Sequence, residues 1–176
     1  MNYIKTGNRI PHEFFITQGR GESNLSAKVG SFHIALQDAE IAQANIMKYS
    51  SVLPAEAVET AFKKMHHGEV AEVIAAQQNG QSGERITAGL AYAWLYDKKS
   101  GLKQGGLVCE YEGSGDEQQA ETALRAGLQE IYENGFSQDY FLKDIRLVTD
   151  SFRPKKKFGT VLIALCFTSF LIPLAP

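Results

Sequence analysis

The chain has few of the residues that mark disulfide-held secreted proteins. Its 176 residues include two cysteines, Cys109 and Cys166, and each lies in an apolar run without a paired spacing. This usage indicates core thiols in a reducing cytosol. The chain is also long enough to bury a core without cross-links. We therefore expect a single cytoplasmic domain over residues 1–176.

Neither sign of charge is in excess, because acids and bases are interspersed and the net charge is −2. This balance argues against a nucleic-acid partner and favours a small-molecule substrate. No basic segment followed by an apolar run opens the chain, so no export signal is expected. The uncharged stretch 158–176 has the outline of a membrane anchor. It is short, interrupted and rich in β-branched and aromatic residues, which favours a buried strand over residues 158–167 and no membrane partner.

Several common catalytic motifs are missing. Residues 19–21 lack the lysine and hydroxyl residue of a phosphate-binding loop and the third glycine of a dinucleotide fingerprint. Ser50 and Ser51 lack the flanking glycines of a nucleophile elbow. The histidines have no Cys or carboxylate companions at ligand spacings, and they are His12, His33, His66 and His67. A nucleotide enzyme, a serine hydrolase and a metal site are therefore all disfavoured.

The apolar patterns predict three helices and about seven strands. Helices are expected at 31–44, at 54–67 and at about 116–134, the last stopped by Gly135. Strands are expected at 13–17, 46–53, 69–76, 86–96, 105–111, 141–151 and 158–167, and a glycine-bearing loop at 19–24. Direct strand-to-strand turns favour an α+β layered domain over a doubly wound parallel sheet.

A Ser-Ser pair, Ser50 and Ser51, ends an apolar run just before Pro54. In an ordered turn, the Ser51 hydroxyl can attack the Ser50 carbonyl and convert the amide to an ester, with Asn45 or a neighbour polarising that carbonyl. β-Elimination then cuts the chain into residues 1–50 and 51–176. Residue 51 loses ammonia and becomes a pyruvoyl group. On the residues alone, the competing interpretation is a plain structural turn, because Ser-Ser pairs are common in loops.

A pyruvoyl group at the head of residues 51–176 would be a covalent cofactor. Its ketone can react with the α-amine of an amino acid and accept the electrons released on decarboxylation, as pyridoxal cofactors do. A self-processing amino acid decarboxylase is therefore one function class that the pair suggests.

Several segments together resemble the pyruvoyl-dependent arginine decarboxylase family. These are residues 14–23, 45–54, 110–113, 156–159 and 164–165, in the family's order and at similar separations. The most specific is 50–54 with Asn45 upstream. The resemblance implies a four-layer αββα sandwich that cleaves itself into a β subunit (1–50) and an α subunit (51–176). It also implies a trimer of αβ units and conversion of arginine to agmatine plus CO₂, with polyamine synthesis and acid resistance both open as its purpose.

The resemblance also assigns roles to individual residues. Ser51 matches the serine that becomes the pyruvoyl group, and Ser50 the residue that ends the β subunit. Asn45 matches an active-site asparagine associated with cleavage. Glu110 matches the glutamate that donates a proton to the decarboxylated carbon. The strand pattern alone instead favours Glu110 as the solvent-facing member of an alternating strand.

One position departs from the arginine-specific pattern. His33 stands where those relatives carry an aspartate for the guanidinium, and an imidazole cannot replace that acceptor. Asp38 or Glu22 supplies the acceptor in one interpretation, and a different amino acid is the substrate in a second. In a third, the protein is a non-catalytic trimeric relative that acts as a binding or partner subunit.

Overall fold

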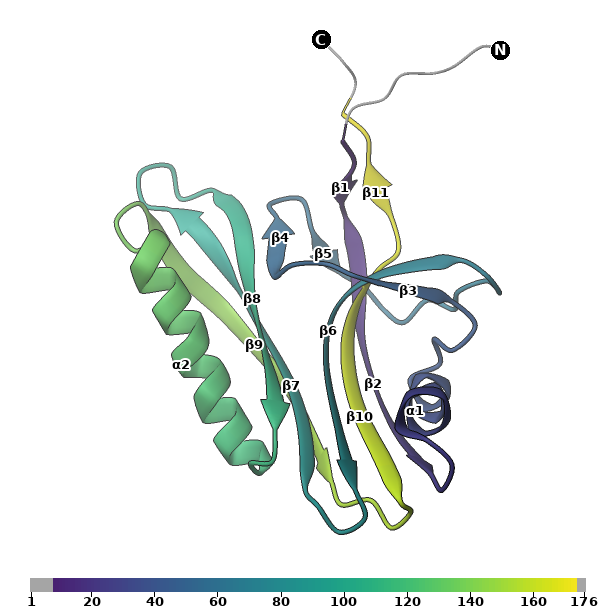
Figure 1. Cartoon of the computed structure of the whole chain (residues 1–176). Helices are drawn as coiled ribbons and strands as arrows, with labels where there is room; N and C mark the ends of the chain where they lie inside the picture. The colour runs from purple at the N-terminus through teal and green to yellow at the C-terminus, as the bar shows by residue number, and fades with distance from the viewer. Residues whose placement is uncertain (1–7, 174–176) are drawn as a thin grey trace, which may run out of the picture.

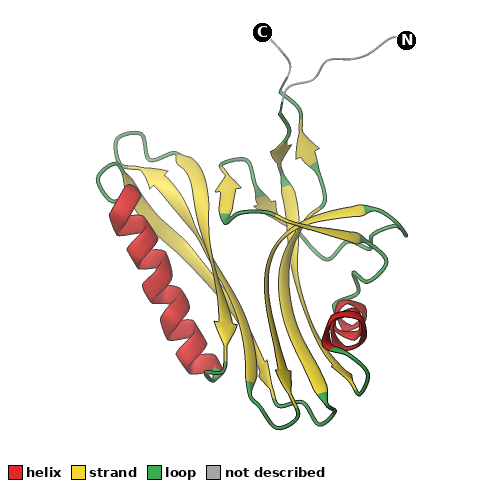
Figure 2. Cartoon of the chain, viewed as in Figure 1, coloured by secondary structure: helices red, strands yellow, loops and turns green. Residues whose placement is uncertain are grey.

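Two β-sheets face each other and enclose the main core in the computed structural model, which describes residues 8–173 (Figure 1). Large apolar side chains from both sheets meet between them, including Phe14, Ile74, Leu90 and Ile163, all 1% exposed or less. Each sheet carries one helix on its outer face (Figure 2). The expected mixed α+β class is confirmed, with two helices in the described part of the chain.

The first sheet has five strands in the order β3-β6-β10-β2-β5. They are β2 (Glu13–Ser23), β3 (Asn45–Lys48), β5 (Val58–Glu59), β6 (Val70–Gln81) and β10 (Phe158–Phe167). The central strand β10 runs antiparallel to both β2 and β6. Covered on both faces, its residues 159–167 are all buried. The predicted strand at 158–167 is therefore confirmed, and neither helix within residues 8–173 has the length and apolar character to cross a bilayer.

The second sheet has four antiparallel strands in the order β4-β8-β7-β9. They are β4 (Val52–Pro54), β7 (Ile86–Asp97), β8 (Lys103–Gly113) and β9 (Tyr140–Phe152). A separate two-stranded ribbon pairs β1 (Ile10–Pro11) with β11 (Phe170–Leu171). The strands predicted for the middle of the chain are confirmed, and each is one to four residues longer than the pattern indicated.

Helix α2 (Glu117–Gly135) covers the outer face of the four-stranded sheet (Figure 1). Asp116 and Gln119 form a reciprocal capping box at its start. Ala120, Leu124 and Leu128 are fully buried at the helical spacing that the sequence shows. The predicted third helix is thus confirmed to within about one residue at each end.

Helix α1 (Phe32–Asp38) covers the five-stranded sheet and is shorter than the predicted 31–44. A π-helical turn η1 (Ala27–Ser31) precedes it. The chain leaves the helix at Glu40, whose φ of 59° lies in the left-handed region. The prediction was too long because the apolar pattern extends past the end of the helix. Ile41 packs in the same cluster as the helix but is not helical.

The predicted loop at 19–24 is wrong, because residues 19–23 belong to β2. Glycine there serves close packing rather than a turn. A Cβ on Gly19 would lie 2.1 Å from the Ala35 carbonyl oxygen, and one on Gly21 would lie 1.9 Å from that of Ser31. Glycine thus lets the helical segment rest directly on the strand.

The predicted second helix at 54–67 is also wrong, because this segment forms β4, β5 and irregular chain. Val58 pairs with Glu13 in the five-stranded sheet instead. Two members of the apparent helical stripe, Val58 and Phe62, are 48% and 44% exposed. Sheet pairing has overridden a local pattern that fitted a helix. The predicted strand 46–53 is likewise split into β3 and β4, in different sheets.

Candidate functional site

The Ser50–Ser51 peptide lies where the chain crosses from one sheet to the other. Lys48 pairs with Val73 in the five-stranded sheet, and Val52 pairs with Leu107 in the four-stranded sheet. Residues 49–51 make the crossing between β3 and β4 (Figure 1). The sequence supplies no regular partner strand for these residues, so their backbone is held by individual contacts.

Backbone hydrogen bonds define the geometry on both sides of this peptide. The N–H of Val52 donates to the Ser50 carbonyl oxygen at 2.9 Å, closing a three-residue turn centred on Ser51. The N–H of Val108 donates to the Ser51 carbonyl oxygen at 3.0 Å. The carbonyl that Ser51 would attack therefore already accepts a hydrogen bond, which polarises it.

Ser51 and Glu110 are brought together by the fold. The Ser51 hydroxyl lies 2.8 Å from both carboxylate oxygens of Glu110, although 59 residues separate them in sequence. Both side chains are half-buried. Among residues 8–173, no basic side chain forms an ion pair with Glu110. This carboxylate is therefore free to act as an acceptor for the Ser51 proton.

Asn45 opens β3, upstream of the crossing. Its exposed side chain donates from Nδ2 to the Gly68 carbonyl oxygen at 3.0 Å, and its N–H donates to the Glu69 carbonyl oxygen at 2.7 Å. Its amide is thus engaged with the loop before β6, and no hydrogen bond within residues 8–173 links it to Ser50. The role of Asn45 in cleavage stays a prediction.

The three candidates for substrate recognition lie away from Ser51 in this chain. His33 is exposed on α1. Asp38 accepts a hydrogen bond from the Arg20 backbone N–H at 2.8 Å. Glu22 accepts from the backbone N–H groups of the turn before β10, including that of Lys156 at 3.2 Å. None of these contacts connects the three side chains with Ser51 or Glu110.

Sequence reasoning missed a buried acid next to the crossing. Glu72 on β6 is 2% exposed, and its carboxylate accepts a hydrogen bond from the Tyr49 hydroxyl and pairs with Arg9. The signal was present, because Glu72 is the single charged residue within the otherwise apolar run 70–76. A buried carboxylate in such a run indicates a dedicated partner.

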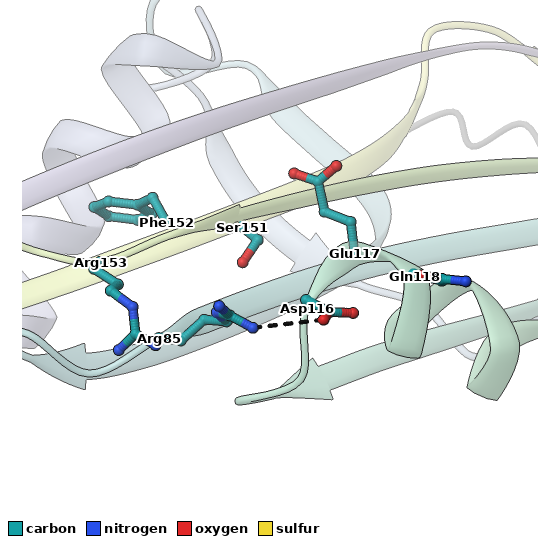
Figure 3. A pocket seen from close by; sticks show the side chains of 7 residues that line it. All are labelled: Arg85, Asp116, Glu117, Gln118, Ser151, Phe152 and Arg153. Atoms are coloured by element: carbon teal, nitrogen blue, oxygen red, sulfur yellow. Dashed lines mark ion pairs between the residues drawn. The ribbon is translucent and has the colours of Figure 1, made fainter.

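A cleft of about 420 Å³ lies near the start of α2 (Figure 3), and neither Ser51 nor Glu110 is among its lining residues. Its charged groups offset one another, as in the ion pair of Arg85 with Asp116 at 3.7 Å. Its hydroxyl, that of Ser151, lies 2.8 Å from the Thr87 hydroxyl. The cleft is lined by Arg85, Asp116, Glu117, Gln118, Ser151, Phe152 and Arg153. Without an activated nucleophile or an uncompensated charge, it offers less chemistry than the crossing.

A smaller apolar hollow of about 270 Å³ adjoins the crossing itself. Residues 52–54 form one wall of it, directly after Ser51, and side chains of β7, β8 and the segment after α2 form the rest. Neither Ser51 nor Glu110 lines this hollow, and Leu95 and Leu107 in its wall belong to the core under α2.

Comparison with known proteins finds a matching family and several relatives that cover most of the chain. A family model described as pyruvoyl-dependent arginine decarboxylase matches residues 13–171. A pyruvoyl-dependent arginine decarboxylase of Chlamydia pneumoniae is 30% identical, covering 93% of this chain and 94% of the relative. One from Thermoplasma volcanium is 33% identical over 61% of this chain and 58% of the relative. One from Methanococcus maripaludis is 26% identical over 70% and 72%.

Proposed function

We propose that this chain cleaves itself at Ser50–Ser51 and then decarboxylates arginine to agmatine. The premise is that the chain belongs to the pyruvoyl-dependent arginine decarboxylase family. The observation that carries the proposal is the contact between the Ser51 hydroxyl and the Glu110 carboxylate beside a polarised Ser50 carbonyl. These contacts support a nucleophile, a base and an activated carbonyl acting together at this peptide.

The first step is acyl transfer from nitrogen to oxygen. Glu110 accepts the Ser51 hydroxyl proton as the oxygen bonds to the Ser50 carbonyl carbon. The C–N bond of the peptide then breaks, and the residue 51 nitrogen takes up a proton and becomes a free amine. The product is an ester between Ser50 and the Ser51 side chain. The hydrogen bond from Val52 to the Ser50 oxygen stabilises negative charge on that atom during the attack.

Elimination and hydrolysis complete the processing. Removal of the residue 51 α-proton expels the Ser50 carboxylate, which becomes the end of residues 1–50. Residue 51 is left as an enamine, and addition of one water with loss of one ammonia converts it to a ketone. No external oxidant or reductant is needed, because oxidation of the residue 51 α-carbon to a ketone is balanced by reduction of its β-carbon, which exchanges a C–O bond for a C–H bond.

The site suits a cofactor made in place. The precursor Ser51 is half-buried beside the Glu110 carboxylate, and the group would be made from the chain itself, so it needs no separate binding cavity. The ketone supplies an electron sink for the bond broken when CO₂ leaves. We assign Glu110 a second task, which is to deliver its proton to the substrate α-carbon after that loss. Asn45 remains the proposed helper in cleavage.

We further propose the four-layer αββα sandwich and a trimer of αβ units. The helix-covered, facing sheets support the layering. Exposed apolar side chains flank the crossing in the chain, namely Met47 on β3 and Val52 on β4, which are 52% and 64% exposed. An apolar surface beside an open site fits contact with a second copy. Such a contact can also bring His33, Asp38 or Glu22 of one subunit to the Ser51 of another.

Substrate choice is tested by CO₂ release from arginine, lysine, ornithine and histidine, with Ser51→Ala as the background. We expect release from arginine alone, with agmatine as the product identified by mass spectrometry. Preference for another amino acid would overturn the arginine assignment and would favour the interpretation in which His33 changes specificity. A cleaved protein without activity toward any of the four would contradict the decarboxylase proposal and favour the non-catalytic relative.

A further inference from the structure

We propose that Glu72 is a positioning residue for self-cleavage, acting through the Tyr49 hydroxyl to hold the scissile Ser50–Ser51 peptide against the Ser51 hydroxyl and Glu110. This inference rests on the proposed self-cleavage. It assigns Glu72 and Tyr49 a task that neither the motif residues nor the Ser51–Glu110 contact covers.

Glu72 is fixed from the five-stranded sheet. It lies on β6 and pairs in register with Met47 on one side and Phe167 on the other. At 2% exposure, its carboxylate has little access to water, and such a group is retained only where donors satisfy it. The Tyr49 hydroxyl and the Arg9 guanidinium are those donors. The carboxylate is therefore a rigid anchor point between the sheets.

Tyr49 is fixed by three separate contacts, directly before the attacked residue. Its N–H donates to the Val73 carbonyl oxygen at 2.7 Å. Its ring lies 5.9 Å from that of Phe167. Its hydroxyl donates to Glu72. Both the backbone and the side chain of Tyr49 are thus tied to the five-stranded sheet, while the Ser50 side chain is exposed and makes no hydrogen bond within residues 8–173.

The position of the Ser50 carbonyl therefore depends on its neighbours. On its C-terminal side the turn to Val52 and the bond from Val108 hold it to the four-stranded sheet. On its N-terminal side Tyr49 holds it to the other sheet. Attack by a hydroxyl on a neighbouring carbonyl requires the reacting atoms to lie in a narrow range of distance and angle. Loosening one of the two attachments lets the Ser50 carbonyl adopt positions outside that range, and this slows the reaction.

The test is the rate of self-cleavage of newly made chains, followed by denaturing gel after a pulse of cell-free synthesis. Tyr49→Phe keeps the ring packing and removes the hydroxyl. Glu72→Gln keeps an acceptor for that hydroxyl, and Glu72→Leu removes it. The matched control is Tyr92→Phe, which removes another hydroxyl-carboxylate bond, that to Glu59 at 2.5 Å, from a hydroxyl with no hydrogen bond to residues 49–51.

Stability is measured separately, as the thermal midpoint of each variant placed in the uncleavable Ser51→Ala chain. We expect Tyr49→Phe to cleave about tenfold more slowly than the unmodified chain. Glu72→Leu should be at least as slow and Glu72→Gln intermediate, while Tyr92→Phe should cleave within about twofold of the unmodified chain. The thermal midpoints of Tyr49→Phe and Tyr92→Phe should fall by similar amounts.

Two results overturn the inference while leaving self-cleavage intact. One is unchanged cleavage in Tyr49→Phe, and the other is equal slowing in Tyr92→Phe, which would show a general effect of stability. Failure of the unmodified chain to cleave is a different result, because it overturns the proposed function and this inference with it.

Discussion

Two contacts made by carboxylates on the inner side of the molecule differ in their partner. Glu110 faces a neutral hydroxyl, that of Ser51. Asp150 on β9 faces the guanidinium of Arg20 on β2, which donates through Nε at 2.9 Å and through a terminal nitrogen. Hydrogen bonding to Asp150 is the main reason that the pKa of Arg20 is raised.

The two partners give the two carboxylates different roles, one structural and one chemical. A carboxylate held by a fixed cation is committed to that pair, and its role is to join the two sheets. A carboxylate that faces a hydroxyl can accept a proton and return it. The same residue type, on strands of the same sheet, therefore serves as an inter-sheet link at Asp150 and as a candidate base at Glu110.

The largest effect should come from Ser51→Ala, which removes both the nucleophile and the cofactor precursor. We expect one uncleaved chain and no decarboxylation, as seen by denaturing mass spectrometry and a CO₂ assay. Ser50→Ala removes a hydroxyl but keeps the attacked carbonyl, so two chains should still form. Cleavage of Ser51→Ala at the same bond would show that the nucleophile lies elsewhere.

Glu110→Gln should slow cleavage by a factor of about 10²–10⁴, the usual contribution of a general base. The measurement is the time course of chain cleavage on a denaturing gel. Glu112→Gln is the control, because Glu112 lies on the same strand two residues along and accepts a hydrogen bond from the Gln77 N–H at 2.8 Å. Equal slowing in both variants would contradict the assignment of Glu110 as the base.

Arg20→Met should destabilise the fold by roughly 1–3 kcal/mol, because it leaves the buried Asp150 carboxylate without its cation. The measurement is urea unfolding of the variant in the uncleavable Ser51→Ala chain. Once folded, Arg20→Met should cleave at the normal rate. A cleavage defect as large as that of Glu110→Gln would remove the distinction between the two carboxylates.

The smallest effect concerns alkaline pH and Tyr92, which links the sheets through Glu59. Burial, and next the hydrogen bond to Glu59, raise the pKa of Tyr92 above its ordinary value. The protonated hydroxyl therefore stabilises the fold fully below pH of about 10, the unfolded value, and this stabilisation is lost as the pH rises beyond it. Tyr92→Phe should lose less stability than the unmodified chain on going from pH 9 to pH of about 11. Parallel losses in urea unfolding would contradict this.

The sequence predicted the elements whose local pattern agrees with their final environment. Helix α2 has a capping residue, a regular apolar stripe and a clear end, and β10 is a long apolar run. Gly19 and Gly21 misled the prediction, since glycine favours turns locally but here permits contact with a helix formed later in the chain. The stripe at 54–67 misled it because sheet pairing decided the outcome.

The site was predicted in part for a similar reason. Ser51 was singled out from the Ser-Ser pair and Glu110 through family resemblance, since no local pattern shows that residues 59 positions apart meet. Tyr49 and Glu72 were not predicted, although a lone acid in an apolar strand was a visible sign. The separation of His33, Asp38 and Glu22 from Ser51 within one chain depends on sheet order, which the pattern of elements leaves open.

The central claim is that this chain makes its own cofactor at Ser51. A denaturing intact-mass spectrum of freshly purified, untagged protein tests it most directly. We predict two species, residues 1–50 ending in a normal carboxylate and residues 51–176 lighter than a serine-headed chain by one ammonia. A single chain that stays uncleaved across pH and time would show that Ser51 is not a cofactor precursor.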